Sequence, residues 1–304
     1  METNLATEKI TVHNVKKFYG ENAVLDVESL SIAKGAIVAI IGKNGSGKST
    51  LLKMISGLLY QSEGDIEVFG IKNQSSKIKE CCKFVLESGQ GYYAYLSARE
   101  NIEYFLGLNK LSLSKVQSHF EKLVRDFDFK EHLDKKVSEL SQGTRQKLAI
   151  IIALLTNPEV LCLDEPTNGL DITSSNQLLS SLKQIAMQEQ KTVLFTTHDL
   201  GFIQSIDARA VVLKEGKLVY DGKINEFSKS LNEKYVFRMA SEKSDLLKRL
   251  QSRNFRTEFQ GEFAIVHCYD EQCRDEIVAN VEFDNLSKES LDVDDLFYKV
   301  IQGD

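Results

Sequence analysis

The sequence is poor in several residue types, and each shortage excludes a class of protein. It has no tryptophan and only two prolines in 304 residues, where average usage would give roughly fifteen prolines. Collagen-like repeats, polyproline recognition arms and proline-stiffened linkers are therefore excluded. The two prolines, Pro158 and Pro166, lie close together, so this rare residue marks one short region of the chain.

Long apolar runs are also missing. The longest unbroken run is Leu148–Leu155, far shorter than the roughly 20 residues that a helix needs to span a bilayer. The first residues contain no apolar signal segment, and the five cysteines are odd in number and irregularly spaced, which argues against a secreted disulfide framework. We therefore expect a cytoplasmic protein with reduced structural thiols, one that is still able to dock on a membrane protein.

A basic excess is the third missing feature. The net charge is -6 and the sequence pI about 5.6, whereas nucleic-acid binders usually carry a basic patch or stripe. No nucleic-acid partner is expected. The hydrophobic share of 42% and the charged share of 27% are ordinary for a globular chain.

Short apolar, β-branched runs predict a parallel sheet, because strands of this kind are buried on both faces. They occur at residues 36–41, 160–163, 192–196 and 210–213. Apolar and polar residues instead alternate near the start of the chain and at 65–69, which is typical of antiparallel strands with one solvated face. Helical patterns dominate from about 75 to 157. We predict an α/β fold: a mixed sheet with a parallel core, an antiparallel β subdomain and a helical subdomain.

The composition changes after Asp221-Gly222, which predicts domains at 1–224 and 225–304. The second domain is expected to be a small α+β unit in the order strand, helix, strand, strand, helix, weak strand and final helix. The predicted segments are 235–240, 244–250, 255–260, 262–268, 271–279, 281–283 and 291–301. The first six segments have the order of a ferredoxin-like unit. No catalytic constellation occurs there.

A glycine-rich loop after the first apolar run fits the pattern G-x-x-x-x-G-K-[ST] of phosphate-binding loops. Its glycines let backbone N–H groups converge on phosphate oxygens, and the following helix adds its positive N-terminal end. Lys48 would place its charge at the β- and γ-phosphates, and Ser49 would offer a hydroxyl to Mg²⁺. The candidate nucleotide-binding residues are Gly42, Asn44, Gly45, Ser46, Gly47, Lys48, Ser49 and Thr50.

A second apolar strand, Val160–Leu163, ends in two adjacent carboxylates. Buried carboxylates are costly unless they are paired or bound to a metal. Asp164 is therefore a candidate Mg²⁺ ligand. Glu165, one residue further on, is placed to orient and deprotonate an attacking water.

Residues 140–147, Leu-Ser-Gln-Gly-Thr-Arg-Gln-Lys, resemble the signature loop of ATP-binding cassette (ABC) ATPases. Other motifs of that family occur in the family's order, and the resemblance covers about residues 8–222. The segment Phe18-Tyr19-Gly20 resembles the adenine-stacking loop, and Asn168-Gly169-Leu170-Asp171 resembles the D-loop. His198 resembles the switch histidine. The resemblance implies a P-loop ABC ATPase core that binds ATP and Mg²⁺, with Tyr19 against the adenine and Asp171 and His198 in the site.

The resemblance also implies a dimer. Ser141 and Gly143 open a helix whose N-terminus can present N–H groups to an anion, and in the family this helix faces the γ-phosphate that the opposite subunit holds. Two cassettes would therefore close head to tail around two nucleotides. A homodimer is the simplest assembly, since this chain carries every motif that one requires.

Two positions depart from the family pattern. The common signature has Gly and Gln where this chain has Gln142 and Thr144, a variation that leaves Ser141 and Gly143 in place. The Q-loop glutamine aligns with Glu87, with Gln90 as the alternative. A Glu at this position is similar to the branch that exports peptide antibiotics and confers self-immunity. Glu87 would still ligate Mg²⁺ through water.

The leading hypothesis is the ATP-binding, ATP-hydrolysing subunit of an ABC transporter that powers export through a separate transmembrane permease. One cassette with a small C-terminal domain, ending in Leu291–Phe297, resembles the ABC-2 exporter type. Three nearby tyrosines, Tyr92, Tyr93 and Tyr95, are candidates for a socket that takes a permease helix. The subunit would lie on the cytoplasmic face of the cell membrane. The alternative, a soluble ABC ATPase acting on ribosomes or nucleic acid, is disfavoured by the acidic balance.

Overall fold

The computed structural model describes residues 9–87, 91–197, 208–223, 234–243, 247, 250, 255–289 and 295. The chain divides into two compact units, 1–221 and 222–304. Each has its own buried apolar cluster: the members of one lie between Ile10 and Leu213, and those of the other lie between Phe237 and Val281.

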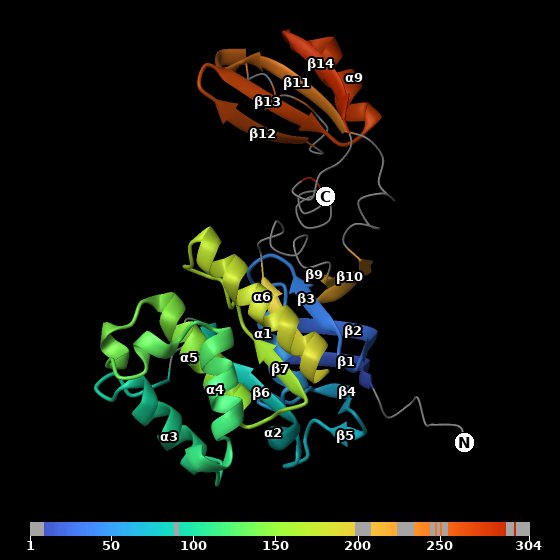
Figure 1. Ribbon diagram of the computed structural model, residues 1–304. Helices are drawn as coiled ribbons and strands as arrows, with labels where there is room; N and C mark the ends of the chain where they lie inside the picture. Colours follow the sequence, from blue (N-terminus) through green and yellow to red (C-terminus); the bar gives the residue numbers. More distant parts are fainter. Residues whose placement is uncertain are drawn as a thin grey trace. The chain divides into compact units, whose positions relative to one another are not determined.

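The described strands of the first unit form one sheet in the order β5-β4-β1-β2-β10-β9-β3-β8-β7-β6 (Figure 1). Their bounds are β1 Lys9–Tyr19, β2 Asn22–Ala33, β3 Ile37–Ile41, β4 Glu63–Val68, β5 Ile71–Lys72, β6 Cys82–Val85, β7 Val160–Leu163, β8 Thr192–Thr197, β9 Arg209–Lys214 and β10 Lys217–Lys223.

The predicted mixed sheet with a parallel core is confirmed. Strand β3 pairs in parallel with β8 and β9, and β7 pairs in parallel with β6 and β8. The alternating strands pair antiparallel instead, β1 with β2 and β4, and β4 with β5. The parallel strands are buried along nearly their whole length, which explains why their sequences are continuously apolar.

Helices cover the parallel part of this sheet, and α3, α4 and α5 gather beside it, on the side away from β1, β4 and β5 (Figure 1). The helix bounds are α1 Lys48–Ile55, α2 Ile78–Cys81, α3 Ala98–Leu108, α4 Gln117–Asp126, α5 Gln142–Leu155 and α6 Ile172–Glu189, with short 3-10 turns at Leu113–Lys115, Lys130–His132 and Val137–Glu139. The predicted helical region of 75–157 also contains β6, which pairs with β7 at the sheet edge.

Helix α5 starts at Gln142, two residues before Thr144, where the apolar and polar pattern of the sequence predicts its first residue. The hydroxyl of Ser141 accepts a hydrogen bond from the Thr144 N–H at 3.2 Å, so that Ser141 is the N-cap and Gln142 the first helical residue. Serine is a preferred N-cap because its oxygen satisfies one of the helix's unpaired N–H groups.

The second unit has an antiparallel sheet in the order β12-β13-β11-β14. Its elements are β11 Lys234–Ala240, β12 Phe255–Gln260, β13 Phe263–Cys268, α9 Glu271–Asn280 and β14 Asn285–Glu289. The weak strand expected at 281–283 is wrong: strand β14 begins at Asn285 and pairs with β11. The expected helices at 244–250 and 291–301 lie outside the described residues except for Leu247, Leu250 and Asp295.

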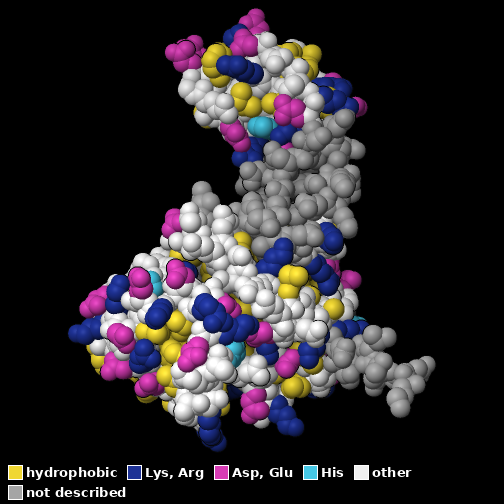
Figure 2. All heavy atoms as spheres, viewed as in Figure 1, with side chains coloured by type: hydrophobic (Ala, Val, Ile, Leu, Met, Phe, Trp, Pro, Cys, Tyr) yellow, Lys and Arg dark blue, Asp and Glu magenta, His cyan; other side chains and the backbone are white. Residues whose placement is uncertain are grey.

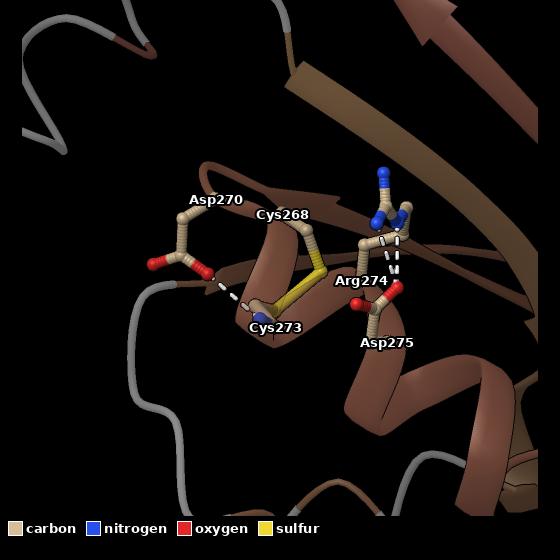
Figure 3. Close-up of a disulfide and its surroundings, with 5 residues drawn as sticks. All are labelled: Cys268, Asp270, Cys273, Arg274 and Asp275. Carbon is tan, nitrogen blue, oxygen red and sulfur yellow. Dashed lines mark hydrogen bonds and ion pairs between the residues drawn. A yellow bond between two sulfur atoms is a disulfide. The ribbon is translucent and has the colours of Figure 1, made fainter.

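The expectation that every thiol is reduced is wrong for one pair, because Cys268 and Cys273 form a disulfide (Figure 3). Cys268 ends β13, and Cys273 lies in the first turn of α9, where its N–H donates to the N-cap residue Asp270 at 2.7 Å. This tight turn brings the two Cα atoms to 5.9 Å, within the range that a disulfide spans. Cys81, Cys82 and Cys162 are buried free thiols.

Among the helices of the described ranges, none has both the length and the apolar content that a membrane span requires.

Candidate nucleotide-binding site

The glycine-rich loop joins the end of β3 to the start of α1, as the sequence predicts. Gly47 is the N-cap of α1 with a φ of 97°, a left-handed conformation that glycine adopts without strain. A Cβ at Gly47 would lie 2.7 Å from Cδ1 of Leu25 and 3.0 Å from the carbonyl oxygen of Val24. Only glycine therefore allows the loop to pack this closely on the neighbouring strand.

Lys48 is the buried cation of the loop. Its ammonium donates to the carbonyl oxygens of Gly42 at 2.8 Å and Lys43 at 3.1 Å, and Nζ lies 3.9 Å from Oε1 of Glu165. Burial lowers the pKa of Lys48, while the charges of Glu165 and Asp164 act in the opposite direction. The backbone oxygens thus hold the ammonium facing the carboxylates.

Asp164 is held at the end of β7 by hydroxyls from two other elements. Ser49 on α1 donates to Asp164 Oδ1 at 2.7 Å, and Thr196 on β8 donates to the same oxygen at 2.8 Å. Asp164 is itself nearly buried, with 9% of its surface exposed. The two candidate Mg²⁺ ligands, Ser49 and Asp164, therefore lie side by side although 115 positions separate them.

Glu165 lies in the turn after β7 with a φ of 45°. Left-handed conformations are uncommon for residues other than glycine. The Glu165 N–H donates to the Thr196 hydroxyl at 2.8 Å. The side chain, 14% exposed, is directed toward Lys48.

One cavity of about 250 Å³ joins the loop to both carboxylates. Its lining residues are Val24, Asn44, Gly45, Gly47, Lys48, Ser49, Thr50, Glu87, Asp164 and Glu165. Glu87 therefore lies at this cavity, as its alignment with the Q-loop predicts. Gln90, the alternative, lies outside the described residues, and so does His198.

The cavity fits a nucleotide with a divalent cation. The hydroxyl of Ser46 is buried in the loop, with no hydrogen-bond partner among the described residues, and buried polar atoms are normally paired. The oxygens of Ser49, Asp164 and Glu87 make a donor set of the hard kind that Mg²⁺ prefers.

Tyr19 is the last residue of β1, and 53% of its surface is exposed. Lys17 Nζ lies 5.3 Å from the centre of its ring, and Gly20 follows in a left-handed turn with a φ of 62°. The ring is therefore presented to solvent at a strand end, although Tyr19 does not line the cavity.

The signature and D-loop residues contact each other within the chain. A Cβ at Gly143 would lie 2.9 Å from Cδ2 of Leu170, so the start of α5 packs closely on the D-loop. Asp171 is the N-cap of α6 and accepts from the Ser174 N–H at 2.9 Å. The packing of Leu170 on Gly143 and the cap of Asp171 on α6 therefore place the starts of α5 and α6 next to each other.

Asn168, whose place in the D-loop motif predicted no site role of its own, links two of the motifs. Its side-chain amide donates to Glu87, and its backbone oxygen accepts from the Gln142 amide at 2.8 Å. Thr196, which contacts both Asp164 and Glu165, was also missed. The only sequence signal for Thr196 is its place two residues before His198.

A glycine-rich phosphate loop entering a helix, beside a buried aspartate at the end of a parallel strand, defines a P-loop nucleotide-binding protein. Comparison with known proteins gives the family. Residues 25–168 match the family described as "ABC transporter". The chain is 37% identical to the ABC transporter ATP-binding protein NatA of Bacillus subtilis, over 71% of this chain and 89% of NatA. It is 31% identical to the bacitracin transport ATP-binding protein BcrA of Enterococcus faecalis, over 86% and 84% of the two chains.

Solved structures agree. CbiO1 from Clostridium perfringens, part of the ABC transporter complex cbiONQ, superposes with a TM-score of 0.66 at 25% identity, over 73% of this chain and 91% of that one. The ATP-binding cassette MJ0796, a dimer with ADP and Pi, superposes with a TM-score of 0.63 at 28% identity, over 70% and 98%. This chain belongs to the ABC transporter ATP-binding protein family, and it is an ATPase.

Proposed function

We propose that this ATPase powers export through a separate transmembrane permease, as a dimer on the cytoplasmic face of the cell membrane. The observation that carries the proposal is the single cavity in which the phosphate loop, Asp164, Glu165 and Glu87 meet. A site of this composition supplies phosphate binding, metal ligation and a general base together.

In the proposed mechanism Lys48 and the N-terminus of α1 hold the β- and γ-phosphates of ATP. Ser49, Asp164 and Glu87 would hold Mg²⁺, which neutralises developing charge on the phosphates when bound. Glu165 takes a proton from the attacking water. We assign His198 to the γ-phosphate from its motif alone.

The second nucleotide contact comes from a partner cassette. Ser141 and Gly143 lie at the start of α5, where N–H groups and the helix dipole favour an anion. In our proposal they face the γ-phosphate held by a second copy of this chain, with Asp171 beside the junction and Tyr19 against the adenine. The dimeric MJ0796 structure with ADP and Pi supports this assembly.

Two observations favour the branch that exports peptide antibiotics. Glu87, an acid at the Q-loop position, lines the cavity. The match to BcrA covers 86% of this chain, which is more than the first unit contains, so the likeness extends into the second unit. Relatives named for uptake or import, such as TupC of Peptoclostridium acidaminophilum and UgpC of Paracoccus denitrificans, match only 69% and 68% of it. Export is therefore the favoured direction.

An aromatic cluster supports the permease contact. Tyr93 donates its hydroxyl hydrogen to the Tyr104 hydroxyl at 3.0 Å, and its ring centroid lies 4.8 Å from that of Tyr104. Tyr92 packs edge-on against Phe105 at 5.0 Å, and Tyr95 has 69% of its surface exposed. Tyr104 is also exposed, whereas Tyr92, Tyr93 and Phe105 are half-buried. A cluster of packed and partly exposed aromatics suits a partner helix, because aromatic side chains bury large apolar area with few rotatable bonds.

The alternative, action on ribosomes or nucleic acid, has less support. On the face of the first unit seen in Figure 2, basic and acidic side chains are interspersed, and the chain carries a net charge of -6. Nucleic-acid binding would favour a continuous basic surface. Co-purification of the tagged protein with ribosomes, rather than with a multi-spanning membrane protein, would reverse our preference.

The catalytic proposal is tested by Glu165→Gln. The amide keeps the size of the side chain but accepts no proton, so we expect ATP binding and ATP-driven dimerisation to persist while turnover falls about 10²–10⁴-fold. Steady-state ATPase assays and size-exclusion chromatography measure the two effects. Glu159→Gln, at the other end of β7 in a surface ion pair with Lys34, is the matched control and should keep wild-type turnover. Near-normal turnover in Glu165→Gln would contradict the role of general base.

A further inference from the structure

Thr196 connects the two carboxylate positions of the site. Its hydroxyl donates to Asp164 Oδ1 at 2.8 Å and accepts from the Glu165 N–H at 2.8 Å. The residue is completely buried in β8, and β8 lies between β3 and β7 in the sheet.

The geometry leaves this hydroxyl one arrangement. A backbone N–H only donates, so the Thr196 oxygen must accept from Glu165, and its single hydrogen is then available for Asp164. The acceptor Oδ1 of Asp164 in turn fixes the direction of that hydrogen. Asp164 therefore orients the Thr196 hydroxyl, and the oriented hydroxyl holds the backbone of Glu165.

Glu165 needs such a partner because its φ of 45° is a conformation that persists only where surrounding structure imposes it. Thr196 belongs to a buried strand bonded on both sides, Ile40 of β3 being its opposite residue. The hydroxyl thus transfers the rigidity of the sheet to the turn that carries the carboxylate.

We propose that Thr196 is a positioning residue for ATP hydrolysis, which holds the Glu165 backbone so that its carboxylate meets the attacking water. The inference rests on the proposed role of Glu165. It predicts a larger loss in turnover than in ATP binding, because Thr196 makes no bond to the phosphate loop and Ser49 still donates to Asp164 when the Thr196 hydroxyl is removed.

The test is Thr196→Val, which keeps the shape of the side chain and removes both hydrogen bonds. We expect kcat to fall on the order of 10²-fold, the effect of a small misplacement of a catalytic group, with little change in KM for ATP. Thr196→Ser restores the hydroxyl and should recover most of the rate. Wild-type kcat in Thr196→Val would overturn the inference.

Thr192→Val is the matched control. Thr192 is also completely buried in β8, and its hydroxyl also accepts from a backbone N–H, that of Gly35, at 2.9 Å. Both valine variants therefore remove the acceptor of one backbone N–H in the same strand, but only Thr196→Val also removes a bond to a residue of the site. Equal loss of activity in both would show a general weakening of the sheet and would overturn the inference.

Two further measurements separate this inference from the proposal for Glu165. Amide hydrogen exchange of the segment around Glu165 should accelerate in Thr196→Val and stay unchanged in Thr192→Val; unchanged exchange in both would overturn the inference. The double variant with Glu165→Gln should turn over at the Glu165→Gln rate to within about twofold, since both changes remove one function. If the rate losses of the two single variants multiply in the double variant, Thr196 acts through something other than Glu165, and the inference is overturned. If Glu165→Gln alone keeps wild-type turnover, the proposed role of Glu165 as general base is wrong, whatever Thr196→Val shows.

Discussion

At the residue scale, the site depends on conformations that few side chains tolerate. Gly47, Gly45 and Glu165 all have left-handed backbones in or beside the cavity. The glycines differ in surroundings: a Cβ at Gly45 would meet nothing within 4 Å, whereas one at Gly47 would contact Leu25 and Val24. Substitutions at the two glycines can therefore separate the effect of close packing from the effect of backbone strain.

We therefore predict that Gly47→Ala destabilises the cassette more than Gly45→Ala. Both substitutions place a Cβ on a left-handed residue at a cost of about 1–2 kcal/mol, but only the first also forces β2 to move. Thermal unfolding of the free protein measures the difference, and loss of nucleotide binding should accompany the larger shift. Equal stabilities for the two variants would contradict the close contact of Gly47 with β2.

At the element scale, the N-terminus of α5 has two roles. Ser141 caps the helix through the Thr144 N–H, and we assign the same end of the helix to the partner's γ-phosphate. The N-terminus of α3 has only the first role: Ser97 caps it through the Glu100 N–H at 3.2 Å, within a capping box.

Ser141→Ala and Ser97→Ala should therefore differ in function and not in stability. Each removes one cap, worth about 1 kcal/mol, and chemical denaturation should show similar losses. Only Ser141→Ala should also lower ATPase activity, because only α5 is expected to face nucleotide across the dimer. An equal activity in the two variants would remove Ser141 from the proposed site.

At the scale of the whole molecule, the two apolar clusters share no residue, so the units have separate cores. We predict two unfolding transitions in calorimetry rather than one, because cooperativity requires a shared core. ATP should raise the transition of the first unit alone.

A reductant should lower only the transition of the second unit, since the disulfide Cys268–Cys273 closes a short loop there. The loss would be about 2 kcal/mol or less for a loop of this length. Cys273→Ala provides the control, because its transitions should not respond to reductant. A shift of the ATP-stabilised transition on reduction would contradict the separation of the two cores.

Local chemistry made much of this site predictable from the sequence. The phosphate loop, the paired carboxylates and the buried strands each occupy one short segment whose residue types suit one task. Contacts made across the sheet were not predictable in the same way. Thr196 carries no pattern of its own, and the link from Asn168 to Glu87 depends on loops that only folding brings together. Strand β14 was misplaced because four of its five residues are exposed and only Leu286 is apolar, so its sequence carries little hydrophobic signal.

The sequence by itself determined the family, the nucleotide loop and the carboxylate strand, because these depend on residue type and on spacing along the chain. The tertiary structure alone decided that Ser49 and Thr196 both donate to one oxygen of Asp164. It also decided that Glu87 lines the cavity beside Asp164, and that Cys268 and Cys273 form a disulfide. The physical reason is distance. Hydrogen bonds and disulfides form between atoms a few ångströms apart, and the order of strands in a sheet sets which distant residues come that close.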